Sequence, residues 1–151
     1  MTFKEEKAYC KLRRLKDNIT NTKKGIIVYQ ANCQKAAVNG LARQLKQKFP
    51  THYQDFLNDN PQLGNILLTR INDDLWVCAV YGQEDYGKYK LFTQYDKLRE
   101  GLEKVEDFAN KNNLQIYVPR KIGCGYSGGN WCTVMDILYE TMPDAIICEW
   151  N

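Results

Sequence analysis

Hydrophobic and polar positions alternate along the chain between short β-type runs and longer segments with helical spacing. Residues 26–29 form a continuous run of Ile, Ile, Val and Tyr, which is typical of a strand buried on both faces. In residues 94–111 apolar side chains recur every three or four positions, which predicts the longest helix. This alternation predicts a three-layer α/β/α sandwich in one domain over residues 1–151, with a mixed sheet of about six strands.

The other expected elements follow from the same two periodicities. Residues 65–71 and 75–81 are expected to pair as antiparallel strands, because only three turn-forming residues separate them. A strand of mixed polarity is expected at residues 8–15, toward an edge of the sheet. Further strands are expected at residues 114–118 and 145–148, and further helices at residues 39–49, about 51–57 and 130–142.

Polar residues mark the expected helix starts. Thr51 is expected to cap the short second helix, and Thr93 with Asp96 resembles a capping box. Asn130 is expected to cap the helix that follows the last loop. His52, the one histidine of the chain, is expected on the surface in the first turn of its helix.

A glycine-rich loop follows the strand expected at residues 114–118. Four of the ten glycines of the chain fall within residues 123–129. Glycines let the backbone turn and approach a ligand closely, and a helix start supplies free N–H groups that suit an anion. The loop at residues 30–40 also leaves a buried strand, and ligands of α/β sheets bind beyond the carboxyl ends of strands. We therefore expect both loops to clasp one phosphate-bearing ligand; a purely structural turn is the alternative.

Composition narrows the choice of partner. The net charge of +3 comes from 21 basic and 18 acidic side chains, which is too balanced to favour nucleic acid but suits an anionic small molecule. Residues 1–7 are charged and lack the apolar stretch of a signal peptide, and no run approaches the roughly 18 apolar residues of a membrane helix. We expect a cytoplasmic protein that has no membrane partner.

The cysteines do not have the spacing of a metal site. No two of them form a CxxC pair, and the single histidine is near none of them in sequence, so neither a metal nor another cofactor is expected. Cys124 differs from the others because it lies in the glycine loop, but a catalytic thiolate needs an activating partner. The six are Cys10, Cys33, Cys78, Cys124, Cys132 and Cys148.

Two stretches carry a resemblance to a known family. Residues 28–32 (VYQAN) resemble the VNAAN stretch of macro domains, the ADP-ribose-binding modules, and residues 37–42 resemble their first loop. Residues 119–128 resemble their second, diphosphate-binding loop. The spacing from Gly123-Cys124-Gly125 to Trp131 is most similar to two subgroups, the terminal ADP-ribose protein glycohydrolase and the yeast ADP-ribose-1″-phosphate phosphatase.

The resemblance implies binding roles that compete with simpler ones. Asn32 would bond the distal ribose or else local backbone, and Asn18 or Asp17 would read adenine or else make a turn. Trp150 would stack on the base or else lie in the core. The implied ligand-binding residues are Asp17, Asn18, Ile19, Ala31, Asn32, Asn39, Gly40, Gly123, Cys124, Gly125, Tyr126, Ser127, Gly128 and Trp150.

The implied catalytic set departs from both subgroups. Ser127 stands where the glycohydrolases have a catalytic Asp, and the position of their Lys falls near Gln83. Tyr29 stands where VNAAN has its first Asn and near the place of a His in the phosphatases. Asn32 and Ser127 remain the candidate catalytic residues, with Asp17, Glu84 or Asp85 as candidate bases.

Three functions are therefore in competition. Removal of a group from ADP-ribose-1″-phosphate or from ADP-ribosylated protein is favoured narrowly, because of the subgroup resemblance. A non-catalytic module that reads or sequesters ADP-ribose is the first alternative. An unrelated α/β domain that binds RNA or protein is the second.

Overall fold

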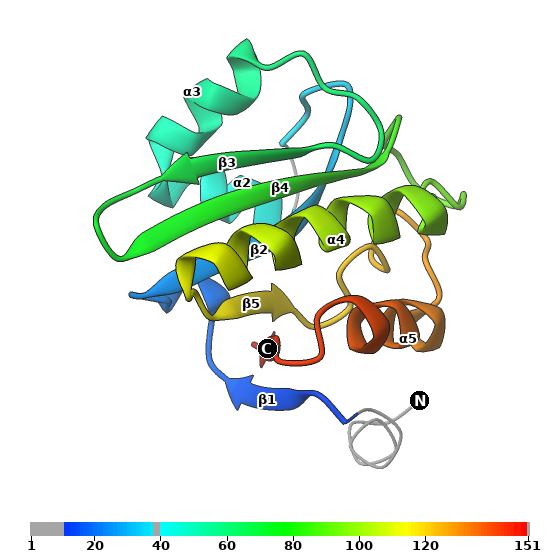
Figure 1. The fold of residues 1–151 in the computed structure, drawn as a ribbon. Coiled ribbons are helices and arrows are strands. Elements are labelled where there is room, and N and C mark those ends of the chain that lie inside the picture. The colour runs from blue at the N-terminus through cyan, green and yellow to red at the C-terminus, as the bar shows by residue number, and fades with distance from the viewer. Residues whose placement is uncertain (1–10, 38–39, 151) are drawn as a thin grey trace.

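The computed structural model describes residues 11–37 and 40–150. Its strands form one six-stranded sheet in the order β1-β6-β5-β2-β4-β3, with helices on both faces (Figure 1). The strands are β1 (Arg13–Lys16), β2 (Gly25–Asn32), β3 (Ile66–Arg70), β4 (Leu75–Gln83), β5 (Ile116–Pro119) and β6 (Ile146–Glu149). The helices are η1 (Ile19–Asn21, 3₁₀), α2 (Gly40–Lys48), α3 (Pro50–Asn58), α4 (Tyr95–Asn112) and α5 (Trp131–Thr141). The expected α/β/α sandwich with a mixed sheet is confirmed.

Alternating residues of the central strands contribute to two apolar layers, one on each face of the sheet. On β2, Ile26 and Val28 pack with α4 and α5, whereas Ile27 and Tyr29 pack with α2 and α3. Because successive side chains of a strand point to opposite faces, a strand buried on both sides needs apolar residues at every position. The burial of β2 on both faces explains the continuous apolar run at residues 26–29 of the sequence.

The parallel direction of the central strands places their carboxyl ends along the same side of the sheet. β2 is parallel to β4 and to β5, and β5 is parallel to β6. Only the β3–β4 hairpin is antiparallel among the described pairs, as expected from its short turn. The carboxyl ends of β2, β4 and β5 therefore open toward the same side of the molecule.

The elements begin and end close to their expected positions, with two differences that bear on the site. β2 continues to Asn32 and β4 to Gln83, so residues expected in loops extend the sheet instead. β1 lies at the sheet edge, as expected, but it begins only at Arg13; residues 11 and 12 of the expected range are not in a strand, and residues 8–10 lie outside the described residues.

Two of the three expected helix caps are wrong. The Asn130 side chain accepts a hydrogen bond from Thr133 N, as expected of a cap. Thr51, however, lies inside α3, which begins at Pro50. Gln94 precedes α4, and no side chain caps its start. The Thr93 hydroxyl has a tertiary partner instead, because it donates to the carbonyl oxygen of Gly123 at 2.7 Å.

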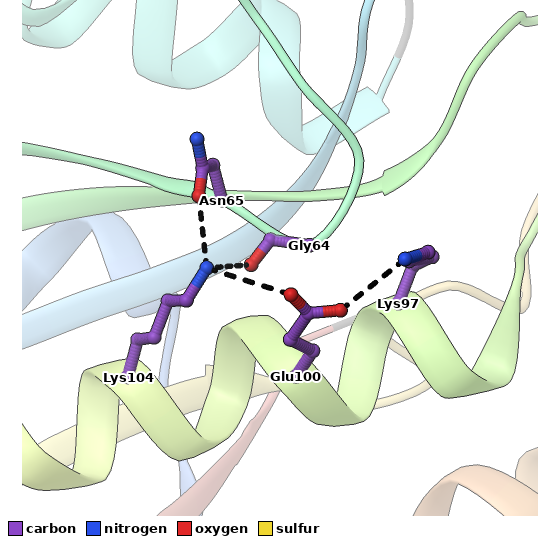
Figure 2. Close-up of polar contacts among 5 residues, drawn as sticks. All are labelled: Gly64, Asn65, Lys97, Glu100 and Lys104. Carbon is purple, nitrogen blue, oxygen red and sulfur yellow. Dashed lines mark hydrogen bonds and ion pairs between the residues drawn. The ribbon is translucent and has the colours of Figure 1, made fainter.

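A lysine fastens α4 to the entry of β3 (Figure 2). Lys104 Nζ donates to Gly64 O and to Asn65 Oδ1, each at 2.8 Å, and lies 3.7 Å from Glu100. Gly64 has a φ of +84° and packs against the Glu100 carboxylate, where a Cβ has no room. This cluster ties the long helix to the loop before the hairpin.

Within residues 11–37 and 40–150, no helix is both long and apolar enough to cross a membrane.

Candidate functional site

A cavity of about 750 Å³ lies beyond the carboxyl ends of β2, β4 and β5. Its walls come from the two loops expected to hold a ligand, and from the loop after β4. They are formed by Tyr29, Gln30, Ala31, Asn32, Ala36, Ala37, Gly40, Leu41, Ala42, Phe56, Gln83, Tyr86, Gly87, Lys88, Pro119, Arg120, Lys121, Ile122, Gly123, Gly125, Tyr126 and Ser127.

The charge of this lining has one sign. Its charged side chains, among the described residues, are the cations Lys88, Arg120 and Lys121. Lys88 Nζ lies 4.9 Å from the ring centroid of Tyr126, and Arg120 Nε lies 3.6 Å from Glu149 Oε1. The described residues of the lining include no carboxylate, imidazole or thiol. Such a cavity suits an anionic ligand and offers it no carboxylate or imidazole as a general base.

The glycine loop has one open glycine between two that are fixed by packing. Gly123 and Gly128 have φ values of +73° and +79°, and a Cβ at Gly128 would meet the backbone of Lys90. A Cβ at Gly125 would meet nothing within 4 Å. Gly123 and Gly128 are therefore needed for the shape of the loop, whereas Gly125 leaves space beside the cavity.

The same loop holds unused hydrogen-bond donors. The backbone N–H groups of Gly125, Tyr126 and Ser127 donate to none of the described residues. All three residues line the cavity. A run of free N–H groups in a turn is the usual form of an anion site in a protein backbone.

The Asn32 side chain makes its hydrogen bonds to the backbone of its own loop. Its Oδ1 accepts hydrogen bonds from Gln34 N at 3.1 Å and Ala36 N at 3.0 Å, and its Nδ2 donates to Ala36 O at 3.0 Å. The side chain is buried and lines the cavity. The alternative in which Asn32 bonds local backbone therefore describes the present geometry, and one N–H of its amide remains for a ligand.

His52 is buried, and the expectation that it lies on the surface is wrong. Thr69 Oγ1 donates to Asp55 Oδ2 at 2.7 Å, so it accepts the bond from His52 Nδ1 at 2.8 Å. His52 Nε2 is then left to accept from the Tyr29 hydroxyl at 2.8 Å. Tyr29 is a cavity residue, so this chain of hydrogen bonds stiffens the wall beneath it.

Burial sets the protonation states of His52 and Tyr29 in this series of hydrogen bonds. It lowers the pKa of His52 to about 4, against the opposing effect of the Asp55 carboxylate. It also raises the pKa of the Tyr29 hydroxyl above its ordinary value. At neutral pH His52 is therefore neutral and Tyr29 is protonated, as the hydrogen bonds require.

The cysteine of the glycine loop is not an activated nucleophile. Burial raises the pKa of Cys124 to about 12, although the positive charge of Lys121 opposes this. Its Sγ donates to Ile122 O at 3.3 Å. A thiol with such a pKa carries almost no thiolate at neutral pH. In the described part of the chain, no cluster of His, Cys, Asp or Glu side chains could hold a metal ion.

Several of the implied ligand residues lie away from the cavity. Asn18 Oδ1 accepts from Thr20 N and Thr20 Oγ1, so it caps the short η1 helix, and Asp17 Oδ1 accepts from Asn18 N. Ile19 is buried in the core layer. None of these three residues lines the cavity, and their geometry is that of a turn.

Of the other implied residues, three do not line the cavity and one is not described by the structure. Trp150 does not line the cavity, and it is 66% exposed, so the alternative in which it lies in the core is wrong. Gly128 lines a smaller groove beside the cavity, and Cys124 lines neither. Asn39 lies outside the described residues.

The sequence pattern did not show how several residues reach the cavity wall. Gln30 and Gln83 lie at the ends of strands that extend further than expected, and Phe56 reaches the wall from α3. The extension of β4 has no strand signal in the sequence, because the expected strand already includes Tyr81, and the next residue, Gly82, is of a type depleted in strands. The position of Phe56 depends on how α3 packs, which the sequence pattern does not give.

Comparison with known proteins adds the fold family. No protein-family model matches the sequence, and no curated protein matches it closely. A solved structure from Bacteroides thetaiotaomicron is 21% identical with a TM-score of 0.82, over 93% of this chain and 99% of that one. The macrodomain of Mycobacterium tuberculosis DarG is 16% identical with a TM-score of 0.74, over 93% and 97%.

A third structure contains a nucleotide. Thermosipho africanus DarTG, solved in complex with ADP-ribose, is 16% identical with a TM-score of 0.72, over 89% of this chain and 40% of that one. Identities this low show a shared fold, and they agree with the resemblance of the two loops. The chain therefore has the macrodomain fold.

Proposed function

We propose that this chain binds ADP-ribose or a close derivative in the cavity and does so without turning it over. The observation that carries the proposal is the cationic cavity wall, in which the N–H groups of Gly125, Tyr126 and Ser127 have no partner among the described residues. The complex of Thermosipho africanus DarTG with ADP-ribose, on the same fold, supports this choice of ligand.

The parts of the ligand are assigned by chemistry. The diphosphate accepts hydrogen bonds from the glycine loop, with Lys88 and Lys121 supplying positive charge nearby. The distal ribose lies toward the first loop, where Gly40 and the remaining N–H of Asn32 are available. The cavity volume of about 750 Å³ is within the range of small-molecule sites.

Processing of the ligand is the weaker alternative. Hydrolysis of an ADP-ribosyl bond or a phosphate ester needs a group that activates water. Ser127 has no carboxylate or imidazole among the described residues that line the cavity, and Gln83 is bound to Gln30 and to the carbonyl of Asp85. Glu84 and Asp85, the candidate bases after β4, are not among the lining residues. These features favour a binding module over a hydrolase.

Calorimetric titration beside a turnover assay separates these functions. The chain is titrated with ADP-ribose, and it is then incubated with ADP-ribose-1″-phosphate and with ADP-ribosylated protein. Saturable binding with no product is expected. Turnover of either substrate would replace the binding module by an enzyme, and an absence of binding would remove the assigned site.

A further inference from the structure

The half-buried side chain of Gln30 lies where three walls of the cavity meet. Gln30 on β2 donates from Nε2 to Gln83 Oε1 at 2.7 Å and to Thr93 Oγ1 at 2.9 Å. The Thr93 hydroxyl donates in turn to the carbonyl oxygen of Gly123 at 2.7 Å. The two strand ends, the start of α4 and the glycine loop are thus joined through side chains.

The direction of this chain of donors is fixed by its last member. The Gly123 carbonyl only accepts hydrogen bonds, so the single Thr93 O–H must donate to it. Thr93 Oγ1 must then accept from Gln30, which places the NH₂ group of the amide toward Thr93 and Gln83. Gln30 Oε1 is left buried, without a partner among the described residues.

Two glycines make room for the amide. A Cβ at Gly82, on β4, would collide with the amide of Gln30. A Cβ at Gly123 would lie 3.1 Å from Gln30 Oε1 and 3.3 Å from Thr93 Oγ1. The backbone on both sides of the amide is therefore fitted to it, and the amide has little freedom to move.

The segment around Thr93 also holds the other end of the glycine loop. Phe92 N and Thr93 N both donate to Ser127 O, at 2.8 and 3.1 Å. Gly129 N closes the loop on Gly123 O at 2.9 Å. The carbonyls of Gly123 and Ser127 are thus both engaged, and Cys124 N donates to Lys121 O at 2.9 Å, while the N–H groups of Gly125, Tyr126 and Ser127 donate to none of the described residues.

We propose that Gln30 and Thr93 are positioning residues, which hold the glycine loop in the shape that presents its free N–H groups to a diphosphate. They act through Gly123 and Ser127 rather than by touching the ligand. The inference rests on the proposed function for the identity of the ligand, but the positioning itself is a property of the unliganded chain.

Thr93→Val tests the positioning, because it removes the hydroxyl and keeps the shape of the side chain. We expect affinity for ADP-ribose, measured by calorimetry, to fall at least about tenfold, and Thr93→Ser to restore it to within about threefold. Gln30→Glu should weaken binding as well, because a carboxylate would draw the Thr93 hydroxyl away from Gly123.

Thr141→Val is the matched control. The Thr141 hydroxyl donates to the Ile137 carbonyl at 2.7 Å, the same kind of bond at the same length, in α5 and outside the cavity wall. This variant should keep full affinity, because its bond lies within one helix and does not reach the glycine loop. Equal loss of affinity in Thr93→Ser and Thr93→Val, or unchanged affinity in Thr93→Val, would overturn the positioning role.

Hydrogen exchange separates this inference from the proposed function. In the unliganded chain, Thr93→Val should accelerate amide exchange at Gly128 and Gly129 several-fold and leave the core of β2 unchanged. If the native chain binds no ADP-ribose, the proposed function fails while faster exchange still supports the positioning. Exchange identical to that of the native chain would refute it.

Discussion

Gly125 and Gly128 lie three residues apart in one loop but have different roles. Gly128 has a positive φ and backbone atoms of Lys90 in the space of its absent Cβ, whereas Gly125 has open space there. The sequence presents both as equivalent glycines of a ligand loop. Only the three-dimensional neighbours distinguish the glycine that shapes the loop from the one that leaves room for a ligand.

Gly125→Val tests this difference at the site. The added side chain enters open space, so the melting temperature should stay near that of the native chain, while affinity for ADP-ribose falls at least about tenfold. Calorimetry and thermal unfolding measure the two effects. Gly128→Ala is the contrasting variant and should lower the melting temperature, because its Cβ meets backbone. Native affinity in Gly125→Val would mean that the loop does not face the ligand.

His52 makes stability depend on pH. Its pKa is about 4 in the folded chain and about 6.5 when exposed, so the unfolded chain binds this proton more tightly. Stability due to His52 is therefore complete above about pH 6.5, and is lost as pH falls toward 4, by about 3 kcal/mol at most.

His52→Gln removes this titration. Urea unfolding from pH 4 to 7 should show a shallower pH dependence in the variant than in the native chain, because carboxylates contribute alike to both. Parallel curves would contradict the buried, neutral state of His52.

At the scale of the element, the cluster around Lys104 predicts unequal effects for two lysines on α4. Lys104 donates two bonds of 2.8 Å to the loop before β3, whereas among the described residues the Lys97 ammonium has its one polar contact with Glu100, at 3.4 Å on the surface (Figure 2). Lys104→Met should lower the free energy of unfolding by about 1 kcal/mol, and Lys97→Met should change it little. Chemical denaturation of both variants measures this. Equal effects would mean that the contact with the loop adds no stability.

The elements themselves could be predicted well because their signals are local. The apolar run of β2, the periodicity of α4 and the Asn130 cap depend on residues near one another in sequence. The start of α4 could not be predicted in this way. Thr93 and Asp96 have the spacing of a capping box, but the hydroxyl of Thr93 bonds Gly123, which lies thirty residues away.

The candidate site could be predicted in outline for a similar reason. Its two loops follow buried strands, so their meeting at one edge follows from the sheet order. The burial of His52 could not be predicted, because its partners Tyr29 and Thr69 come from two different strands. Asn18 fits a family motif, yet its oxygen caps a local turn.

At the scale of the whole molecule, the fold accounts for the position of the cavity in which we propose that a ligand binds. Parallel strands bring the first loop, the glycine loop and the loop after β4 around one cavity. Its charged groups are cations, and its described lining has no carboxylate, imidazole or thiol. These two features are the grounds on which we propose binding without turnover.

Titration of the native chain with ADP-ribose, with the same samples assayed for product from ADP-ribose-1″-phosphate and ADP-ribosylated protein, tests this claim most directly. We expect saturable binding of one ligand per chain, loss of that binding in Gly125→Val, and no product from either substrate. Turnover by the native chain, or failure of the native chain to bind ADP-ribose, would contradict it.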